Sequence, residues 1–314
     1  MSKQRCCLRE RSLSMRFKSI GLVAVCFMFS SIAFAAVQQK AVAFDFDGDG
    51  RSDLSVFRAS DARWFINRST EGDYQMAFGF ATDTIVPADY DGDGKTDIAV
   101  YRADEGIWHI FQSSTSTHVQ FKYGLPKDIP APADFDGDGK ADMAIYRPST
   151  GHWWINRSTS GSITIPYGQK GDKPVPADYD GDGMADVALF RPSDGTWHID
   201  RSKEGNLVVK WGVAVDQPIP ADYDGDGKAD IAVYRSSDGV WYQWLSSTQE
   251  PEYVKFGQDK DMPSPGDYDG DGRADITVFR PENGKWSINQ SKEGRITVAY
   301  GMDGDKPMAN AFVK

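Results

Sequence analysis

One nine-residue motif recurs six times along the chain, and this repeat constrains the fold more than any other feature of the sequence. The motif reads Asp-aromatic-Asp-Gly-Asp-Gly-x-x-Asp, and successive copies begin 44 or 45 residues apart. A fixed period of this length predicts a repeat architecture in which each unit stacks on its neighbours. The six copies begin at Asp45, Asp89, Asp134, Asp178, Asp222 and Asp267.

Each repeat continues with short segments that have the composition of β-strands. An apolar run ends in an arginine, a second run contains a tryptophan, a third closes on an aromatic-glycine pair, and a proline-containing approach leads to the next motif. These runs are rich in Val, Ile, Tyr, Phe and Trp, and no amphipathic helical pattern interrupts them. Because four short strands in about 44 residues are typical of a propeller blade, the sequence predicts an all-β fold, a β-propeller with six blades of four antiparallel strands. A propeller of seven blades, in which the two ends combine into an irregular blade, is the alternative.

Two residues recur in every repeat and are interpreted as architecture. The arginine is expected to pair with a loop carboxylate or carbonyl between blades, and its alternative use is as an arm that binds anions or sugars. The tryptophan is expected to lie in the core, because large aromatic side chains dominate burial. These residues are Arg58, Arg102, Arg147, Arg191, Arg235 and Arg280, with Trp64, Trp108, Trp153, Trp197, Trp241 and Trp286.

The end of the repeat array predicts how the ring closes. Six full units occupy about residues 42–301, and the segment 305–308 matches the approach segment 172–175, although no motif follows it. We expect this leftover strand to pair with the first unit, because an unclosed propeller leaves two sheet faces exposed.

The acidic motifs are predicted to be calcium loops. In the copy at 178–186, the side-chain oxygens of positions 1, 3, 5 and 9 and the backbone carbonyl of position 7 can converge on one ion. Hard oxygen ligands in this number suit Ca²⁺, and a glycine at position 6 permits the positive φ of a tight turn. Four carboxylates within nine residues repel one another unless a cation lies between them.

Three other interpretations of the motif are less favoured. An EF-hand loop needs a glutamate at position 12 and flanking helices, whereas Leu189 occupies that position here and strands flank the loop. Mg²⁺ prefers to keep its waters. A metal-free Asp-Gly turn does not require four acids in all six copies.

We therefore predict about six structural calcium ions, one for each motif. The predicted ligands are Asp45, Asp47, Asp49, Arg51 and Asp53; Asp89, Asp91, Asp93, Lys95 and Asp97; Asp134, Asp136, Asp138, Lys140 and Asp142; Asp178, Asp180, Asp182, Met184 and Asp186; Asp222, Asp224, Asp226, Lys228 and Asp230; and Asp267, Asp269, Asp271, Arg273 and Asp275.

The motif, the apolar strand after it, the aromatic-glycine pair and the proline-containing approach together resemble the FG-GAP/VCBS repeats, the calcium-loop blades also found in the propeller of integrin α-subunits. The resemblance covers about residues 42–301. It implies a calcium-binding β-propeller in a secreted or surface protein, commonly used for adhesion or ligand binding. Members of the family also occur as modules attached to enzymes, and some related propellers bind sugars.

The first 35 residues have the organisation of a secretory signal peptide. Basic residues precede an apolar run from Ile20 to Phe34, which ends in a small-x-small cleavage pattern. Cleavage is predicted after Ala35, so that residues 36–314 form a single propeller that is secreted, periplasmic or at the cell surface, without a stable membrane span. A membrane anchor is the alternative, but a span needs about 20 apolar residues and this run is shorter. A true start at Met15 is also compatible with the pattern.

Composition limits the partners and the chemistry. The formal charge of −11 argues against a nucleic-acid partner, and all three cysteines lie in the first 26 residues. The remaining chain has no cysteine nucleophile, no His-Glu-x-x-His motif and no nucleophile-elbow sequence, so no enzyme is expected. Residues that vary between repeats are weak candidates for ligand binding, and these are His109, Trp154, His198, Tyr242 and Trp244.

The sequence therefore favours a secreted calcium-binding propeller that acts as a non-catalytic binding or adhesion module for an extracellular protein or glycan. A lectin-like carbohydrate-binding propeller is the first alternative. A polysaccharide-cleaving enzyme is the second, and it would have to use carboxylates that are already assigned to calcium.

Overall fold

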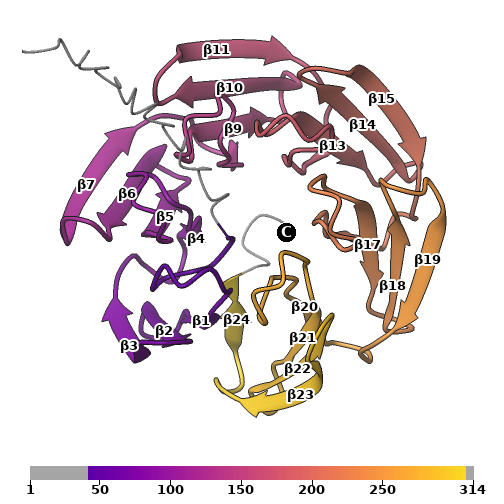
Figure 1. Ribbon diagram of the computed structural model, residues 1–314. Helices are drawn as coiled ribbons and strands as arrows, with labels where there is room; N and C mark the ends of the chain where they lie inside the picture. Colours follow the sequence, from indigo (N-terminus) through magenta and orange to yellow (C-terminus); the bar gives the residue numbers. More distant parts are fainter. Residues whose placement is uncertain (1–41, 309–314) are drawn as a thin grey trace, which may run out of the picture. The chain divides into compact units, whose positions relative to one another are not determined.

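The computed structural model describes residues 42–308, all of which lie within one compact unit, Gln38–Lys314. The predicted signal peptide lies outside the described residues. The described chain forms six four-stranded antiparallel sheets that stand around a ring, as Figure 1 shows. The all-β prediction and the count of six blades are confirmed, and the alternative of seven blades is wrong.

From the centre of the ring outward, each blade contains a short inner strand, two longer strands and an outer strand. Blade 1 is β24 (Asp305–Pro307), β1 (Leu54–Arg58), β2 (Arg63–Arg68) and β3 (Gly72–Ala77); blade 2 is β4 (Thr84–Ile85), β5 (Ile98–Arg102), β6 (Ile107–Gln112) and β7 (Thr117–Lys122); blade 3 is β8 (Ile129–Pro130), β9 (Met143–Arg147), β10 (His152–Arg157) and β11 (Gly161–Pro166); blade 4 is β12 (Lys173–Pro174), β13 (Val187–Arg191), β14 (Thr196–Arg201) and β15 (Gly205–Lys210); blade 5 is β16 (Gln217–Pro218), β17 (Ile231–Arg235), β18 (Val240–Trp244) and β19 (Pro251–Lys255); blade 6 is β20 (Met262–Pro263), β21 (Ile276–Arg280), β22 (Lys285–Gln290) and β23 (Gly294–Ala299).

The sheets are offset from the sequence repeats, and this offset closes the ring. In blades 2 to 6, the inner strand precedes the acidic motif of the blade, so it comes from the end of the preceding repeat. Blade 1 has no preceding repeat, and β24 from the other end of the array supplies its inner strand, with Phe57 opposite Lys306. The predicted closure of the ring by the leftover strand is confirmed.

The core lies between neighbouring blades, where the second strand is buried on both faces and the third strand on one. Residues Ile98 to Tyr101 of β5 are all buried, which suits a strand covered on both sides. The six recurring tryptophans are at most 1% exposed, which confirms their assignment to the core. In blade 2, Trp108 packs against Tyr101 at a ring distance of 5.1 Å, and its indole N–H donates to the carbonyl of Tyr123.

The recurring arginines have a partner that the sequence analysis did not identify. Arg102 donates two hydrogen bonds, each 3.1 Å long, to the two carboxylate oxygens of Asp83, which comes just before the inner strand of the same sheet. The expected pairing with a loop carboxylate is therefore confirmed, although this carboxylate belongs to the same sheet and does not lie between blades. The same bidentate pair forms in every blade: Arg58 with Asp305, Arg102 with Asp83, Arg147 with Asp128, Arg191 with Asp172, Arg235 with Asp216, and Arg280 with Asp261.

Candidate metal centres and ligand surfaces

The acidic motifs form loops at the start of the second strand of each blade, at the opposite end of that strand from the arginine. In loop 1, residues 45–53, the position-1 carboxylate of Asp45 folds the chain around itself. One of its oxygens accepts from the N–H of Gly48 at 2.6 Å, and the other accepts from the N–H of Gly50 at 2.8 Å. Gly50 has a φ of 86°, a left-handed conformation that favours glycine. The glycines therefore serve the turn, as the motif predicts.

The position-9 carboxylate ties each loop to the hairpin turn between the third and fourth strands of its blade. In loop 1, the oxygens of Asp53 accept from the N–H of Phe46 and from the N–H of Ser69, both at 2.8 Å. Asp53 is 2% exposed, and this burial raises its pKa to about 7. Burial likewise raises the pKa of Asp97 to about 7 and that of Asp142, Asp186, Asp230 and Asp275 to about 6. An ionised carboxylate at position 9 is thus costly unless a cation lies beside it.

In four of the six loops, the position-3 carboxylate has one oxygen without a hydrogen-bond partner within residues 42–308. Asp47 is 7% exposed, and one of its oxygens accepts from the N–H groups of Thr70 and Glu71 in the hairpin turn, at 2.9 and 3.0 Å. Its other oxygen, Oδ1, is buried without a hydrogen-bond partner within residues 42–308. The equivalent oxygens of Asp136, Asp180 and Asp269 are in the same condition.

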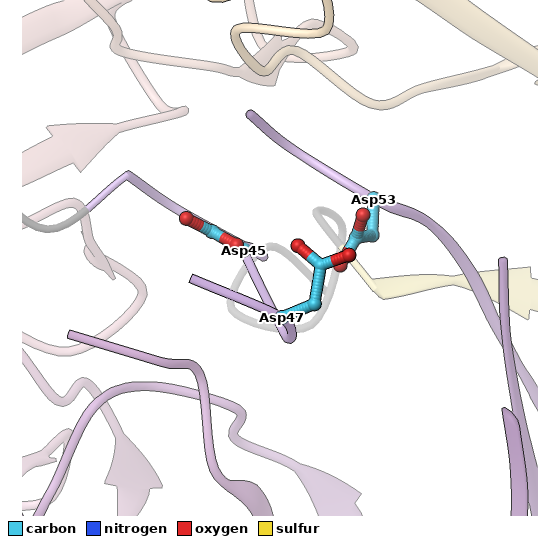
Figure 2. A group of neighbouring side chains, drawn as sticks. All are labelled: Asp45, Asp47 and Asp53. Atoms are coloured by element: carbon cyan, nitrogen blue, oxygen red, sulfur yellow. The ribbon is translucent and has the colours of Figure 1, made fainter. Parts of the chain in front are cut away.

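These carboxylates come together as one group of possible ligands. In each of loops 1 to 4, an oxygen from positions 1, 3 and 9 lies within 4.8 Å of the other two. Figure 2 shows loop 1, in which Asp47 and Asp53 face each other beside Asp45. Two ligands of one calcium ion lie no more than about 5 Å apart, because calcium–oxygen distances are about 2.3 to 2.6 Å. The spacing and the unused buried oxygen therefore fit a bound Ca²⁺.

The remaining predicted ligands have other contacts. In loop 1, Asp49 at position 5 accepts from the N–H of Arg51 and from the hydroxyl of Ser69. In loop 5, the position-5 residue Asp226 replaces position 9 in the acidic group, beside Asp222 and Asp224. The backbone carbonyls of position 7 stay a prediction. These carbonyls belong to Arg51, Lys95, Lys140, Met184, Lys228 and Arg273.

Neighbouring loops are joined to one another around the ring. The N–H of Thr96 in loop 2 donates to the carbonyl of Asp45 in loop 1 at 2.6 Å, and each loop makes the same bond to the one before it. The N–H of Ser52 in loop 1 donates to the carbonyl of Asp267 in loop 6, also at 2.6 Å, so the circle of bonds is closed. The side chain at position 7 also packs on the preceding loop. Lys95 of loop 2 approaches Gly48 of loop 1 so closely that a Cβ on Gly48 would lie 3.2 Å from Lys95 Cε.

The sequence analysis missed the serine at the hairpin turn of each blade. Its N–H donates to the position-9 carboxylate, and its hydroxyl donates to the position-5 carboxylate. The signal was a serine 16 residues after the last aspartate of every motif. These serines are Ser69, Ser113, Ser158, Ser202, Ser246 and Ser291.

Among the weak ligand candidates, Trp154 lies at a surface pocket. The pocket has a volume of about 270 Å³ and is lined by residues of blades 2 and 3, among them Tyr123, Leu125 and Arg147. Trp154 is 37% exposed, and the guanidinium carbon of Arg147 lies 4.9 Å from the centre of its ring. The pocket therefore offers an aromatic face beside a fixed cation.

The other candidates lie in three different blades and do not meet at Trp154. His109 in blade 2 lies beside His118, with Nδ1 and Nε2 of the two rings 3.1 Å apart. His198 occupies the equivalent place in blade 4. In blade 5, the hydroxyl of Tyr242 accepts from Arg235 at 2.9 Å, and Trp244 packs on Trp211 at a ring distance of 5.4 Å. These side chains serve local packing, and the structure assembles no single site from them.

Comparison with known proteins identifies the repeat. The family described as FG-GAP-like repeat matches residues 45–100, 134–189 and 222–278. No curated protein matches the chain significantly.

Solved structures share the fold at low sequence identity. BBS1N in complex with ARL6DN has a TM-score of 0.52 and 14% identity, over 83% of this chain and 80% of that one. Virginiamycin B lyase from Staphylococcus aureus has a TM-score of 0.50 and 8% identity, over 84% and 94% of the two chains. A lectin from Agrocybe aegerita, described as recognising terminal N-acetylglucosamine, has a TM-score of 0.49 and 17% identity, over 84% and 92%. The first two likenesses establish a common propeller fold and nothing about activity. Within residues 42–308, no helix is long and apolar enough to cross a membrane.

Proposed function

The chain belongs to the FG-GAP-like repeat family, and from this premise we propose that it is a secreted, calcium-binding β-propeller that acts as a non-catalytic binding or adhesion module. The observation that carries the calcium assignment is the buried, unused oxygen of the position-3 carboxylate, as in Asp47 and Asp180. An unsatisfied buried acceptor costs about 1 to 3 kcal/mol, and a carboxylate costs more. A cation between positions 1, 3 and 9 removes that cost.

The calcium ions would act as structural components of the propeller. Positions 1, 3 and 9 would hold the ion in loops 1 to 4, and positions 1, 3 and 5 would hold it in loop 5. Bound Ca²⁺ would supply the positive charge that the acidic group lacks. Because position 9 is hydrogen-bonded to the hairpin turn, the ion would fasten the start of the second strand to the far end of the third. We expect binding to stabilise the blades rather than to take part in a reaction.

Calorimetry tests the calcium assignment. Titration of Ca²⁺ into the metal-free chain should release heat and saturate at about six ions, and chelation should lower the melting temperature markedly. Mg²⁺ at the same concentration is the control, and it should raise the melting temperature less. A melting temperature that does not change on thorough chelation contradicts the structural role.

Secretion is proposed from the sequence pattern at residues 1–35. Mass spectrometry of the protein recovered from a secreting host should give a mature N-terminus at Ala36. An uncleaved chain in the membrane fraction contradicts this proposal and supports an anchor.

A carbohydrate ligand is the second candidate, and the pocket at Trp154 favours it. A partly exposed indole offers an apolar face for a sugar ring, and Arg147 lies at its edge for the hydroxyl groups. A glycan array in calcium buffer should show binding that Trp154→Ala removes. Ser287→Ala, at the equivalent position of blade 6, is the matched control and should bind as the parent does. An array without hits, or hits that Trp154→Ala leaves unchanged, contradicts this candidate.

A further inference from the structure

The hairpin turns that contact the acidic loops are of two kinds. In blades 1, 3, 4 and 6, three residues separate the third and fourth strands, and the fourth strand begins with a glycine of positive φ. In blade 2, four residues separate β6 from β7, and in blade 5, six residues separate β18 from β19. Both longer turns contain a residue other than glycine at positive φ, Ser116 at 54° and Gln249 at 56°.

The short turn grips the position-3 carboxylate with two backbone groups. In blade 4, one oxygen of Asp180 accepts from the N–H groups of Lys203 and Glu204, at 2.9 and 3.0 Å. Blades 1, 3 and 6 repeat this pair of bonds. The carboxylate is therefore fixed in orientation, and its second oxygen is buried without a hydrogen-bond partner in the described part of the chain.

The long turn places a single backbone group and a hydroxyl there instead. In blade 2, one oxygen of Asp91 accepts from the N–H of Ser114 at 3.4 Å and from its hydroxyl at 2.6 Å. Asp224 in blade 5 has the same arrangement with Ser247, at 3.3 and 2.6 Å. This difference reaches the second oxygen, because Oδ1 of Asp91 accepts from the N–H of Asp93 at 3.3 Å, and Oδ1 of Asp224 accepts from that of Asp226 at 3.1 Å.

We propose that the six loops form two classes of calcium site, with tight sites in blades 1, 3, 4 and 6 and weaker sites in blades 2 and 5. The inference rests on the proposed calcium binding and adds its distribution. In the tight class, the second oxygen of the position-3 carboxylate is already oriented and accepts no hydrogen bond from residues 42–308. In the weaker class, the same oxygen already accepts a backbone N–H, and the ion has to compete with this hydrogen bond. A net hydrogen bond of about 1 kcal/mol corresponds to a difference of roughly five- to tenfold in affinity.

The two classes are arranged regularly in the ring. Blades 2 and 5 lie across the ring from each other, as Figure 1 shows, and each has a blade of the tight class on either side. The structure thus assigns the weaker sites to two separated positions rather than to one edge of the molecule.

Calorimetric titration of Ca²⁺ into the metal-free mature chain tests the proposal. The expected isotherm has two phases, with about four ions in the first and about two in the second, and dissociation constants that differ at least fivefold. Six equivalent sites overturn the proposal and leave calcium binding itself intact. No heat and no bound calcium overturn the proposed function as well.

Matched variants assign the phases to blades. Asp180→Asn should remove one ion from the first phase, and Asp91→Asn should remove one from the second. Loss from the opposite phase in either variant overturns the assignment.

A turn exchange tests the cause of the difference. Replacing residues 113–117 with the Ser-Lys-Glu-Gly sequence of residues 202–205 gives blade 2 the short turn of blade 4. The isotherm should change to about five tight ions and one weak ion. The reverse exchange, which puts the turn of residues 113–117 into blade 4, should give about three and three. A far-ultraviolet spectrum like that of the parent shows that each chain is folded, and unchanged phase sizes in folded variants overturn the proposal.

Discussion

At the residue scale, a bidentate pair of arginine and aspartate recurs in all six blades. The aspartate side chains are at most 2% exposed and the arginines are 18 to 29% exposed, so the anion is the more deeply buried partner. Each aspartate also accepts from a backbone N–H of its own approach loop, as Asp83 does from Phe80. The pair therefore joins the inner strand to the second strand in every blade.

Removal of one arginine should be costly because it leaves a buried carboxylate unpaired. For Arg191→Met we expect the free energy of unfolding to fall by about 3 kcal/mol, measured by urea denaturation in saturating calcium. Arg63→Met removes a cation that lies 3.7 Å from the exposed Asp61, and it should cost no more than about 0.5 kcal/mol. Equal losses in the two variants contradict this interpretation.

The histidines beside these arginines should make stability depend on pH. Burial, and after it the charge of the neighbouring arginine, lowers the pKa of His109 and of His198. A histidine whose folded pKa lies below its unfolded value of about 6.5 favours folding when neutral. Its contribution is present above pH 6.5 and is lost as the pH falls through the folded pKa. The double variant His109→Gln, His198→Gln should therefore lose less unfolding free energy than the parent between pH 7.5 and 5.5. An equal or larger loss contradicts the lowered pKa values.

At the scale of elements, the sequence predicted the strands well because a recurring residue or motif marks each of the longer strands or its end. The motif starts the second strand, the tryptophan marks the third, and the aromatic-glycine pair ends the fourth. The aspartate partner of the arginine was missed because it stands alone in a variable loop, although Asp83 and its equivalents recur every 44 or 45 residues. The two kinds of hairpin turn were missed because they differ only in length. The effect of this difference on the acidic loops becomes visible only when the hydrogen bonds to Asp91 and Asp180 are compared.

Glycines in the turns should differ in how much they tolerate a side chain. Gly183 in loop 4 has a φ of 88° with open space around it, whereas a Cβ on Gly195 would lie 2.2 Å from the carbonyl oxygen of Gly212. Gly183→Ala should cost about 1 kcal/mol for the backbone conformation alone. Gly195→Ala should cost clearly more, because a backbone carbonyl must move. Urea denaturation of both variants in saturating calcium checks the order, and the reverse order contradicts it.

At the scale of the whole molecule, closure depends on three residues from the far end of the repeat array. The strand β24 pairs with β1, and Asp305 within it supplies the carboxylate for Arg58. The sequence predicted this closure from the partial match of residues 305–308 to an approach segment. The pocket at Trp154 was not predictable in the same way, because residues of two repeats, among them Tyr123 and Arg147, line it only after the blades are stacked.

Loss of the closing strand should open the ring. A chain that ends after Asp303 leaves the edge of β1 unpaired, with Val56 and Phe57 beside it. We expect a lower melting temperature and association through the free edge, measured by size-exclusion chromatography with light scattering. A chain that ends after Met308 keeps β24 and is the control. A monomeric chain of unchanged melting temperature after the longer truncation contradicts the role of this strand.

The circle of backbone hydrogen bonds between the acidic loops determines how the ring responds when one loop is damaged. A linear series of contacts can separate into two parts when one contact is lost, but a circle that loses one contact remains a connected series. Loop 1 is bonded to loop 2 through Asp45 and to loop 6 through Ser52, so an oxidised, cleaved or mutated loop leaves its neighbours attached to the rest through their other sides. Such redundancy would let the ring tolerate damage to any one loop.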